Sequence, residues 1–117
     1  MMKLKSYDAL SDLTDKHIDL FLEDNNKCIV LCWKDHCPYC SQIFPFVQSL
    51  SIKMNDVSFA HINLGKNRKT TKKYKISTVP TVLVFHNNKF KKSIIGMKSK
   101  ITLKQDIHLA FASLFIY

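Results

Sequence analysis

The fold is decided by the stretch Cys28-Ile29-Val30-Leu31-Cys32-Trp33-Lys34-Asp35-His36-Cys37-Pro38-Tyr39-Cys40. Its first part, residues 28–33, is a continuous apolar run, which is typical of a strand buried on both faces of a central sheet. The residues after Cys40 have the pattern of a helix, and Pro38 would lie in its first turn, where the missing N–H costs nothing. The sequence therefore predicts a buried strand that delivers two cysteines to the start of a helix.

Cys37 and Cys40 have the spacing that disulfide exchange requires. The reaction needs a thiolate that attacks and a second thiol close enough to resolve the mixed disulfide. Cys37 would lie at the helix N-cap, where free N–H groups and the helix dipole favour the thiolate, and Cys40 would lie partly covered in the first turn. We expect Cys37 to be the nucleophile and Cys40 the resolving thiol. Pro38 would restrict the loop, and His36 would place positive charge near the thiolate.

An alternative for this pair is a structural zinc half-site or two inert thiols. The chain has no second Cys-x-x-Cys and no paired histidines to complete a zinc site, so we expect no bound metal. The other two cysteines, Cys28 and Cys32, lie four residues apart on the predicted strand. About 13 Å then separates them, and they cannot form a disulfide. We expect Cys32 to be buried and Cys28, at the start of the strand, to be more exposed.

Length and composition indicate one ordered domain covering residues 1–117. The chain is 46% apolar and contains only two glycines and three prolines, enough for a single core without cross-links. The first residues contain no continuous apolar segment, and no window approaches the ~18 apolar residues of a membrane span. We therefore expect a cytoplasmic protein without a membrane partner. In such a reducing compartment a Cys-x-x-Cys pair is more often catalytic or metal-binding than structural.

Hydrophobic periodicity predicts the element order βαβαβαββα, an α/β domain with a central mixed sheet and helices on both faces. The expected strands lie within residues 4–13 and at 28–33, 57–64, 81–85 and 90–95. The expected helices are one capped by Thr14 with Asp15 in its first turn, one following Cys37 with Pro45 inside it, a short basic one within 65–75, and a last one capped by Thr102 that docks residues 114–117 on the sheet. A hairpin turn is expected at 86–89.

These residues together resemble the thioredoxin superfamily. Trp33 resembles the tryptophan that ends the central strand of thioredoxins, and Pro45 sits where thioredoxins kink the second helix. Residues 76–81 resemble the loop that carries the cis-proline of the superfamily, with Pro80 as that residue, and Gly96 falls where thioredoxins place a glycine. The resemblance extends over nearly the whole chain and implies the thioredoxin fold.

The resemblance also implies the activity, a dithiol–disulfide oxidoreductase acting on protein disulfides as a monomer. It implies a redox-active Cys37–Cys40 disulfide with no bound cofactor, reduced again by a flavoenzyme of the thioredoxin-reductase type or by glutathione. Pro80 would pack against the cysteine pair, and Val79 would present its backbone groups for strand-like pairing with a substrate peptide. The substrate-binding residues would be Thr78, Val79 and Gly96, and the supporting residues Trp33, His36, Pro38, Tyr39 and Pro80.

Three positions depart from the thioredoxin pattern. Leu31 occupies the position of a buried carboxylate that accepts a proton from the resolving cysteine, and His61 matches its partner lysine. His61 either takes over proton handling or is simply packed. The dipeptide Pro38-Tyr39 is the one found in glutaredoxins, and Lys34 with residues 78–80 resembles their glutathione site. A glutathione-dependent, glutaredoxin-like reductase is therefore one alternative.

The strong positive charge suggests a second alternative from another class. The formal net charge is +9, and residues 66–75 are the most basic stretch. A thioredoxin-fold binding module could use this face to dock an acidic partner. Nucleic acid is disfavoured as that partner, because the lysines are not interleaved with an aromatic platform on which bases could stack.

Overall fold

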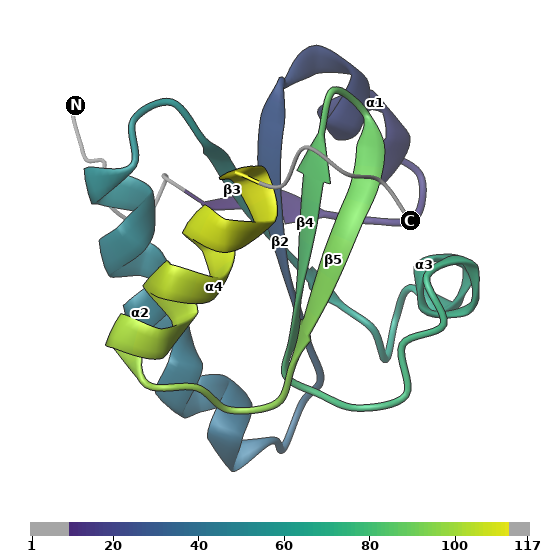
Figure 1. The fold of residues 1–117 in the computed structure, drawn as a ribbon. Coiled ribbons are helices and arrows are strands. Elements are labelled where there is room, and N and C mark those ends of the chain that lie inside the picture. The colour runs from purple at the N-terminus through teal and green to yellow at the C-terminus, as the bar shows by residue number, and fades with distance from the viewer. Residues whose placement is uncertain (1–9, 113–117) are drawn as a thin grey trace, which may run out of the picture.

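Five strands and four helices follow one another along residues 10–112, the part of the chain that the computed structural model describes (Figure 1). The order is β1 (Leu10–Leu13), α1 (Ile18–Asp24), β2 (Lys27–Trp33), α2 (Pro38–Lys53), β3 (Ser58–Asn63), α3 (Arg68–Lys73), β4 (Thr81–His86), β5 (Lys89–Ile95) and α4 (Lys100–Ala112). The predicted order βαβαβαββα is confirmed. The expectations for residues 4–9 and 114–117 lie outside the described residues.

β2 is the central strand of a mixed sheet whose strand order is β1-β3-β2-β4-β5. The strands β1, β3 and β2 run parallel, whereas β4 is antiparallel to β2 and β5 is antiparallel to β4. The apolar run of the sequence explains this central place, because such a strand must be covered on both faces. Cys32 pairs with Thr81 in the β2–β4 ladder. The C-terminal end of β2 and the start of β4 therefore lie side by side at the same end of the sheet.

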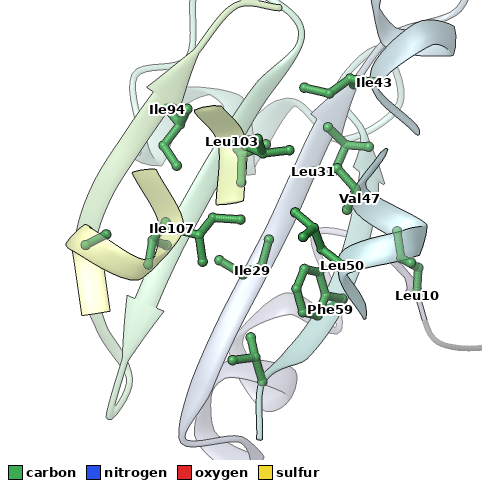
Figure 2. Packing of buried hydrophobic residues seen from close by; sticks show 14 residues of the cluster. Leu10, Ile29, Leu31, Ile43, Val47, Leu50, Phe59, Ile94, Leu103 and Ile107 are labelled. Atoms are coloured by element: carbon green, nitrogen blue, oxygen red, sulfur yellow. The ribbon is translucent and has the colours of Figure 1, made fainter. Parts of the chain in front are cut away.

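Helices bury both faces of the sheet, as predicted. Ile29 and Leu31 of β2 lie in the core beneath α2 and α4 (Figure 2). Cys28 and Cys32 lie in the second core, on the face covered by α1. This alternation follows from the two-residue period of a strand, which sends successive side chains to opposite faces. The buried helical residues are Ile43, Val47, Leu50, Leu103, Ile107 and Ala110 in the first core and Ile18 and Leu22 in the second.

The expected exposure of Cys28 is wrong, because only 1% of its surface is accessible. β2 begins one residue earlier, at Lys27, and the Cys28 thiol turns back to donate a hydrogen bond to the carbonyl of Asn25 (3.3 Å). Cys32 is buried, as predicted, and both thiols are free. Burial raises the pKa of Cys28 to about 11 and the pKa of Cys32 to about 12.

The N-terminal cap predicted for α1 is wrong. Thr14 precedes an extra turn, in which the His17 N–H donates to the Thr14 carbonyl (3.0 Å), and the helix starts only after His17. Asp15 is thereby freed for a distant helix, α3. Its carboxylate accepts hydrogen bonds from the N–H groups of Lys69 (3.1 Å) and Thr70 (2.9 Å). Thr14 was the predicted N-cap, whereas Asp15, predicted in the first turn of this helix, caps a helix more than fifty residues away.

The cap predicted for α4 is also displaced, from Thr102 to Ser99. The helix begins at Lys100, and the Ser99 hydroxyl oxygen accepts a hydrogen bond from the Thr102 N–H (3.1 Å). Thr102 therefore lies inside the first turn, and Ser99 caps it. Both residues have the side chain that capping requires, and the one directly before the helix takes the role.

Candidate redox site

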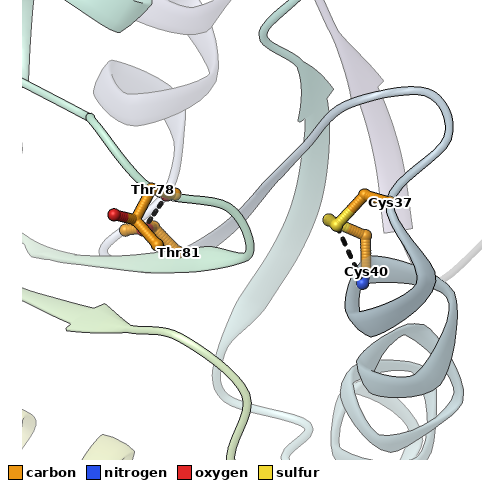
Figure 3. The surroundings of a disulfide bond; sticks show 4 residues. All are labelled: Cys37, Cys40, Thr78 and Thr81. Carbon is orange, nitrogen blue, oxygen red and sulfur yellow. Dashed lines mark hydrogen bonds between the residues drawn. A yellow bond between two sulfur atoms is a disulfide. The ribbon is translucent and has the colours of Figure 1, made fainter.

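Cys37 and Cys40 form a disulfide in the first turn of α2 (Figure 3). Cys37 is the N-cap residue, and Pro38 follows in the first helical turn. The Cys37 sulfur accepts a hydrogen bond from the Cys40 backbone N–H (3.2 Å). Cys40 is buried, with 3% of its surface exposed, whereas Cys37 is partly exposed. The helix therefore directs its free N–H groups and the positive end of its dipole at the more accessible sulfur.

The chain enters α2 through a left-handed residue, His36, whose φ is 61°. Histidine is among the few non-glycine residues enriched in this conformation. The preceding residue, Asp35, is tied to the end of β3, because the Asn63 side-chain amide donates to its carboxylate (3.4 Å). The loop between β2 and α2 is thus anchored to the end of β3 two residues before Cys37.

A groove of about 620 Å³ opens beside the disulfide. Its lining residues are Trp33, Lys34, Asp35, His36, Cys37, Pro38, Cys40, Ser41 and Phe44. Trp33, His36 and Pro38 thus meet the two cysteines there. Tyr39 does not line this groove and is 59% exposed. Phe44 was missed by the sequence reasoning as a site residue, although its i+4 spacing from Cys40 places both on one face of α2.

The second group of predicted residues lies in the loop before β4. The Val79–Pro80 peptide bond is cis, as expected from the resemblance. The Thr78 carbonyl accepts a hydrogen bond from the Thr81 hydroxyl (2.6 Å), and the Pro80 carbonyl accepts one from the Gly96 N–H (2.8 Å). Gly96 has a φ of 87°, which favours glycine. Figure 3 shows the disulfide directed from the start of α2 toward this loop.

Val79 differs from its neighbours in this loop. Within residues 10–112, neither its N–H nor its carbonyl has a hydrogen-bond partner. The loop does not line the groove beside Trp33. The predicted site residues therefore fall into two groups, one along the groove and one in the Pro80 loop.

Trp33 is held in place by a hydrogen bond to His61 of β3. The indole Nε1–H donates a hydrogen bond to His61 Nδ1 (3.1 Å), and the Phe44 ring packs edge-on against the imidazole with 5.2 Å between centroids. Asp12 Oδ1 lies 3.9 Å from the same Nδ1. Burial lowers the pKa of His61, and the Asp12 carboxylate opposes this only in part.

No cluster of three or more His, Cys, Asp or Glu side chains among residues 10–112 is placed to hold a metal ion. In the same part of the chain, no helix has the length and apolar character to span a membrane. The reactive atoms described at this site are the two sulfur atoms of Cys37 and Cys40.

Comparison with known proteins gives a consistent match. A family model described as Thioredoxin matches residues 9–109. A thioredoxin of Rickettsia typhi is 30% identical over 83 residues, which cover 70% of this chain and 79% of the relative. A thioredoxin of Streptomyces clavuligerus is 26% identical and covers 81% of this chain and 90% of the relative.

Solved structures of low sequence identity share the fold. Oxidised mitochondrial thioredoxin 3 of Saccharomyces cerevisiae superimposes with a TM-score of 0.80 at 20% identity, covering 89% of this chain and 98% of that one. Thioredoxin f from spinach chloroplast superimposes with a TM-score of 0.81 at 18% identity, covering 88% and 94%.

Proposed function

The chain belongs to the thioredoxin family and is a dithiol–disulfide oxidoreductase, and we propose that it reduces protein disulfides with Cys37 as nucleophile and Cys40 as resolving thiol. The observation that carries the assignment of roles is the asymmetry of the pair. Cys37 is the more exposed sulfur and sits at the helix N-cap, where it accepts the Cys40 N–H. A thiolate there is stabilised by the helix N-terminus and can reach a substrate.

The reaction transfers two electrons in two exchange steps. The Cys37 thiolate attacks one sulfur of the substrate disulfide, forming a mixed disulfide and releasing the first substrate thiolate. Cys40, after losing its proton, attacks the Cys37 sulfur and releases the second substrate thiolate. The substrate ends as a dithiol and the protein as the Cys37–Cys40 disulfide. Leu31 provides no proton acceptor for the second step, because its side chain is hydrocarbon.

The substrate peptide is proposed to lie along the Pro80 loop. The N–H and carbonyl of Val79, which have no partner in the described part of the chain, support this placement, since an extended peptide can satisfy both as an added strand does. Thr78 and Gly96 hold the loop through the Thr78 carbonyl and the Gly96 N–H. In this proposal Val79 contacts the peptide backbone, and Thr78, Pro80 and Gly96 shape the loop that presents it.

Single-cysteine variants test the two roles. Cys40→Ser, reduced and mixed with oxidised insulin, should accumulate a mixed disulfide through Cys37, because the resolving thiol is absent. Cys37→Ser should trap none, and Cys32→Ala should turn over normally as the matched control. A mixed disulfide formed only by Cys37→Ser would reverse the assignment. Retained turnover in Cys37→Ser/Cys40→Ser would contradict the mechanism.

The electron donor is proposed to be a flavoenzyme of the thioredoxin-reductase type, as in the family. Insulin reduction by NADPH with thioredoxin reductase should therefore exceed that with glutathione and glutathione reductase. Turnover only with glutathione would support the glutaredoxin-like alternative. That alternative is favoured by the dipeptide Pro38-Tyr39 and by Lys34, which lines the groove.

The basic helix α3 supports a second candidate function, the docking of an acidic protein. Four of its six residues are basic and exposed: Arg68, Lys69, Lys72 and Lys73. Docking through these side chains should weaken with salt and with Lys69→Glu/Lys72→Glu, while insulin reduction remains unchanged. If the Cys37→Ser/Cys40→Ser variant retains both partner binding and biological activity, docking is the main function.

A further inference from the structure

The hydrogen bond between Trp33 and His61 defines the protonation state of the histidine. An indole N–H can only donate, so the His61 Nδ1 that it reaches at 3.1 Å must offer a lone pair. His61 is therefore the neutral imidazole with its proton on Nε2. A proton on Nδ1 removes the acceptor that the indole uses.

The same nitrogen has a second possible partner. Asp12 Oδ1 lies 3.9 Å from Nδ1, outside hydrogen-bond distance but close enough to attract a charged imidazolium. Asp12 and His61 are paired in the β1–β3 register, so both side chains lie on the same sheet face. Nδ1 can thus serve Trp33 when it is neutral or Asp12 when it is protonated.

Among residues 10–112, the other groups packed around His61 leave Asp12 as its charged neighbour. Leu31 of β2 stands beside it in register, and Phe44 of α2 packs against its ring, and neither titrates. Cys40 lies one helical turn before Phe44 and titrates only when the disulfide is reduced. Lys34, Asp35 and His36 line the groove beside Trp33 and carry ionisable side chains, so the test must separate them from His61.

We propose that His61 is a positioning residue for disulfide exchange, which in its neutral form holds Trp33 in the wall of the groove beside the disulfide. Protonation of Nδ1 breaks the indole hydrogen bond and turns the imidazolium toward Asp12. Trp33 then loses its fixed position in the wall that it shares with Cys37 and Cys40. The protein therefore carries a pH-sensitive support for the groove beside its disulfide, built from one side chain of each parallel strand.

The emission of Trp33 reports this event directly, because Trp33 is the only tryptophan in the chain. The titration is done on the oxidised protein, in which Cys37 and Cys40 do not ionise. Wild-type emission should show one transition with a midpoint below 6.5. His61→Leu, close to histidine in size, and His61→Asn, which offers an amide oxygen near the position of Nδ1, should both lose it. The transition should persist in His36→Gln.

Asp12→Asn gives the sharper test, since Asp12 is 80% exposed at its side chain and its replacement leaves the core intact. The midpoint should fall by roughly 0.1–0.7 pH units, the range expected from one exposed ion pair. An unchanged midpoint in Asp12→Asn, a transition retained in His61→Leu, or one lost in His36→Gln would each overturn the proposal.

The effect on the reaction is measured as the pH profile of kcat/KM for insulin reduction, and this part rests on the proposed function. The ratio of the wild-type kcat/KM to that of His61→Asn should fall as the pH is lowered, with the same midpoint as the fluorescence transition. The reason is that only the wild type releases Trp33. His61→Asn should retain more activity than His61→Leu at pH 7.5, since its amide oxygen can accept the indole N–H. Equal activity of the two variants would mean that His61 does not position Trp33 for the reaction. If no variant, wild type included, reduces insulin, the proposed function fails, while the fluorescence test still decides the role of His61.

Discussion

Leu31 and His61 are directly paired in the β2–β3 ladder, and their side chains lie on the same face of the sheet. Leu31 has no exposed surface, whereas His61 retains some contact with solvent. The centre of the sheet under α2 is thus hydrocarbon beside a neutral imidazole. A charge at position 31 would therefore be fully buried, whereas a charge at His61 would keep some contact with solvent.

Leu31→Asp should destabilise the protein by about 3–5 kcal/mol at pH 7, because a carboxylate would be buried without a charged partner. Burial raises the pKa of such a carboxyl, or else His61 must take up the proton instead. In either case the folded state binds more protons than the unfolded state, so part of the loss should be regained as the pH falls from 7 to 5. Urea unfolding at both pH values measures this. Leu31→Asn, the uncharged control, should not recover, and the same recovery in both variants would contradict the argument.

The lowered pKa of His61 predicts a pH-dependent contribution to stability. The unfolded chain binds a proton near 6.5, and the folded protein binds it only at lower pH. Stability is therefore full above 6.5 and declines as the pH falls toward the folded pKa. Urea unfolding of wild type and His61→Leu between pH 8 and 5 should show a difference in slope on the acid side. Parallel curves for the two proteins would be incompatible with a depressed pKa at His61.

Cys28 and Cys32 should resist alkylation in the folded, reduced protein. With pKa values of about 11 and about 12, on the order of one part in a thousand of the Cys28 thiol, and less of Cys32, is thiolate at pH 8. Iodoacetamide followed by peptide mass mapping should label Cys37 and leave Cys28 and Cys32 unmodified. All four cysteines should react in denaturant. Fast labelling of Cys28 without denaturant would show that the start of β2 opens.

Asp15→Asn should lower the free energy of unfolding by about 1 kcal/mol, because it weakens the cap of α3. Burial acts to raise the pKa of Asp15, but hydrogen bonds from Thr70 and Lys69 outweigh it and hold the pKa below its usual value. The stabilisation is present above the unfolded pKa of 3.8 and is lost as the pH falls through the lower folded value. Urea unfolding at pH 6 and at pH 2 measures the difference.

Asp19→Asn is the matched control for this cap. Asp19 forms an exposed ion pair with Lys73 at 3.5 Å, and such pairs contribute little. Its replacement should change stability by less than that of Asp15 at pH 6. Equal effects of the two variants would mean that α3 is not stabilised by the hydrogen bonds that Asp15 accepts from the Lys69 N–H and from the N–H and hydroxyl of Thr70.

The parts of the fold that depend on neighbouring residues were predictable from the sequence. The apolar run of residues 28–33, the proline after Cys37 and the turn at 86–89 each specify their structure through local backbone preferences and side-chain periodicity. The resemblance to thioredoxins added the cis bond before Pro80. The disulfide at the start of α2 was also predictable, because Cys37 and Cys40 lie within four consecutive residues.

The remaining features depend on which strands become neighbours, and only the tertiary structure decides that. Trp33 and His61 are 28 residues apart, and Asp15 and Thr70 are 55 apart. Their hydrogen bonds exist because β3 pairs with both β1 and β2 in a particular register. Local signals placed a cap at Thr14 and an exposed thiol at Cys28, and tertiary contacts overrode both. The sequence by itself determined the reactive pair and its helix, and the packing of the sheet determined what surrounds them.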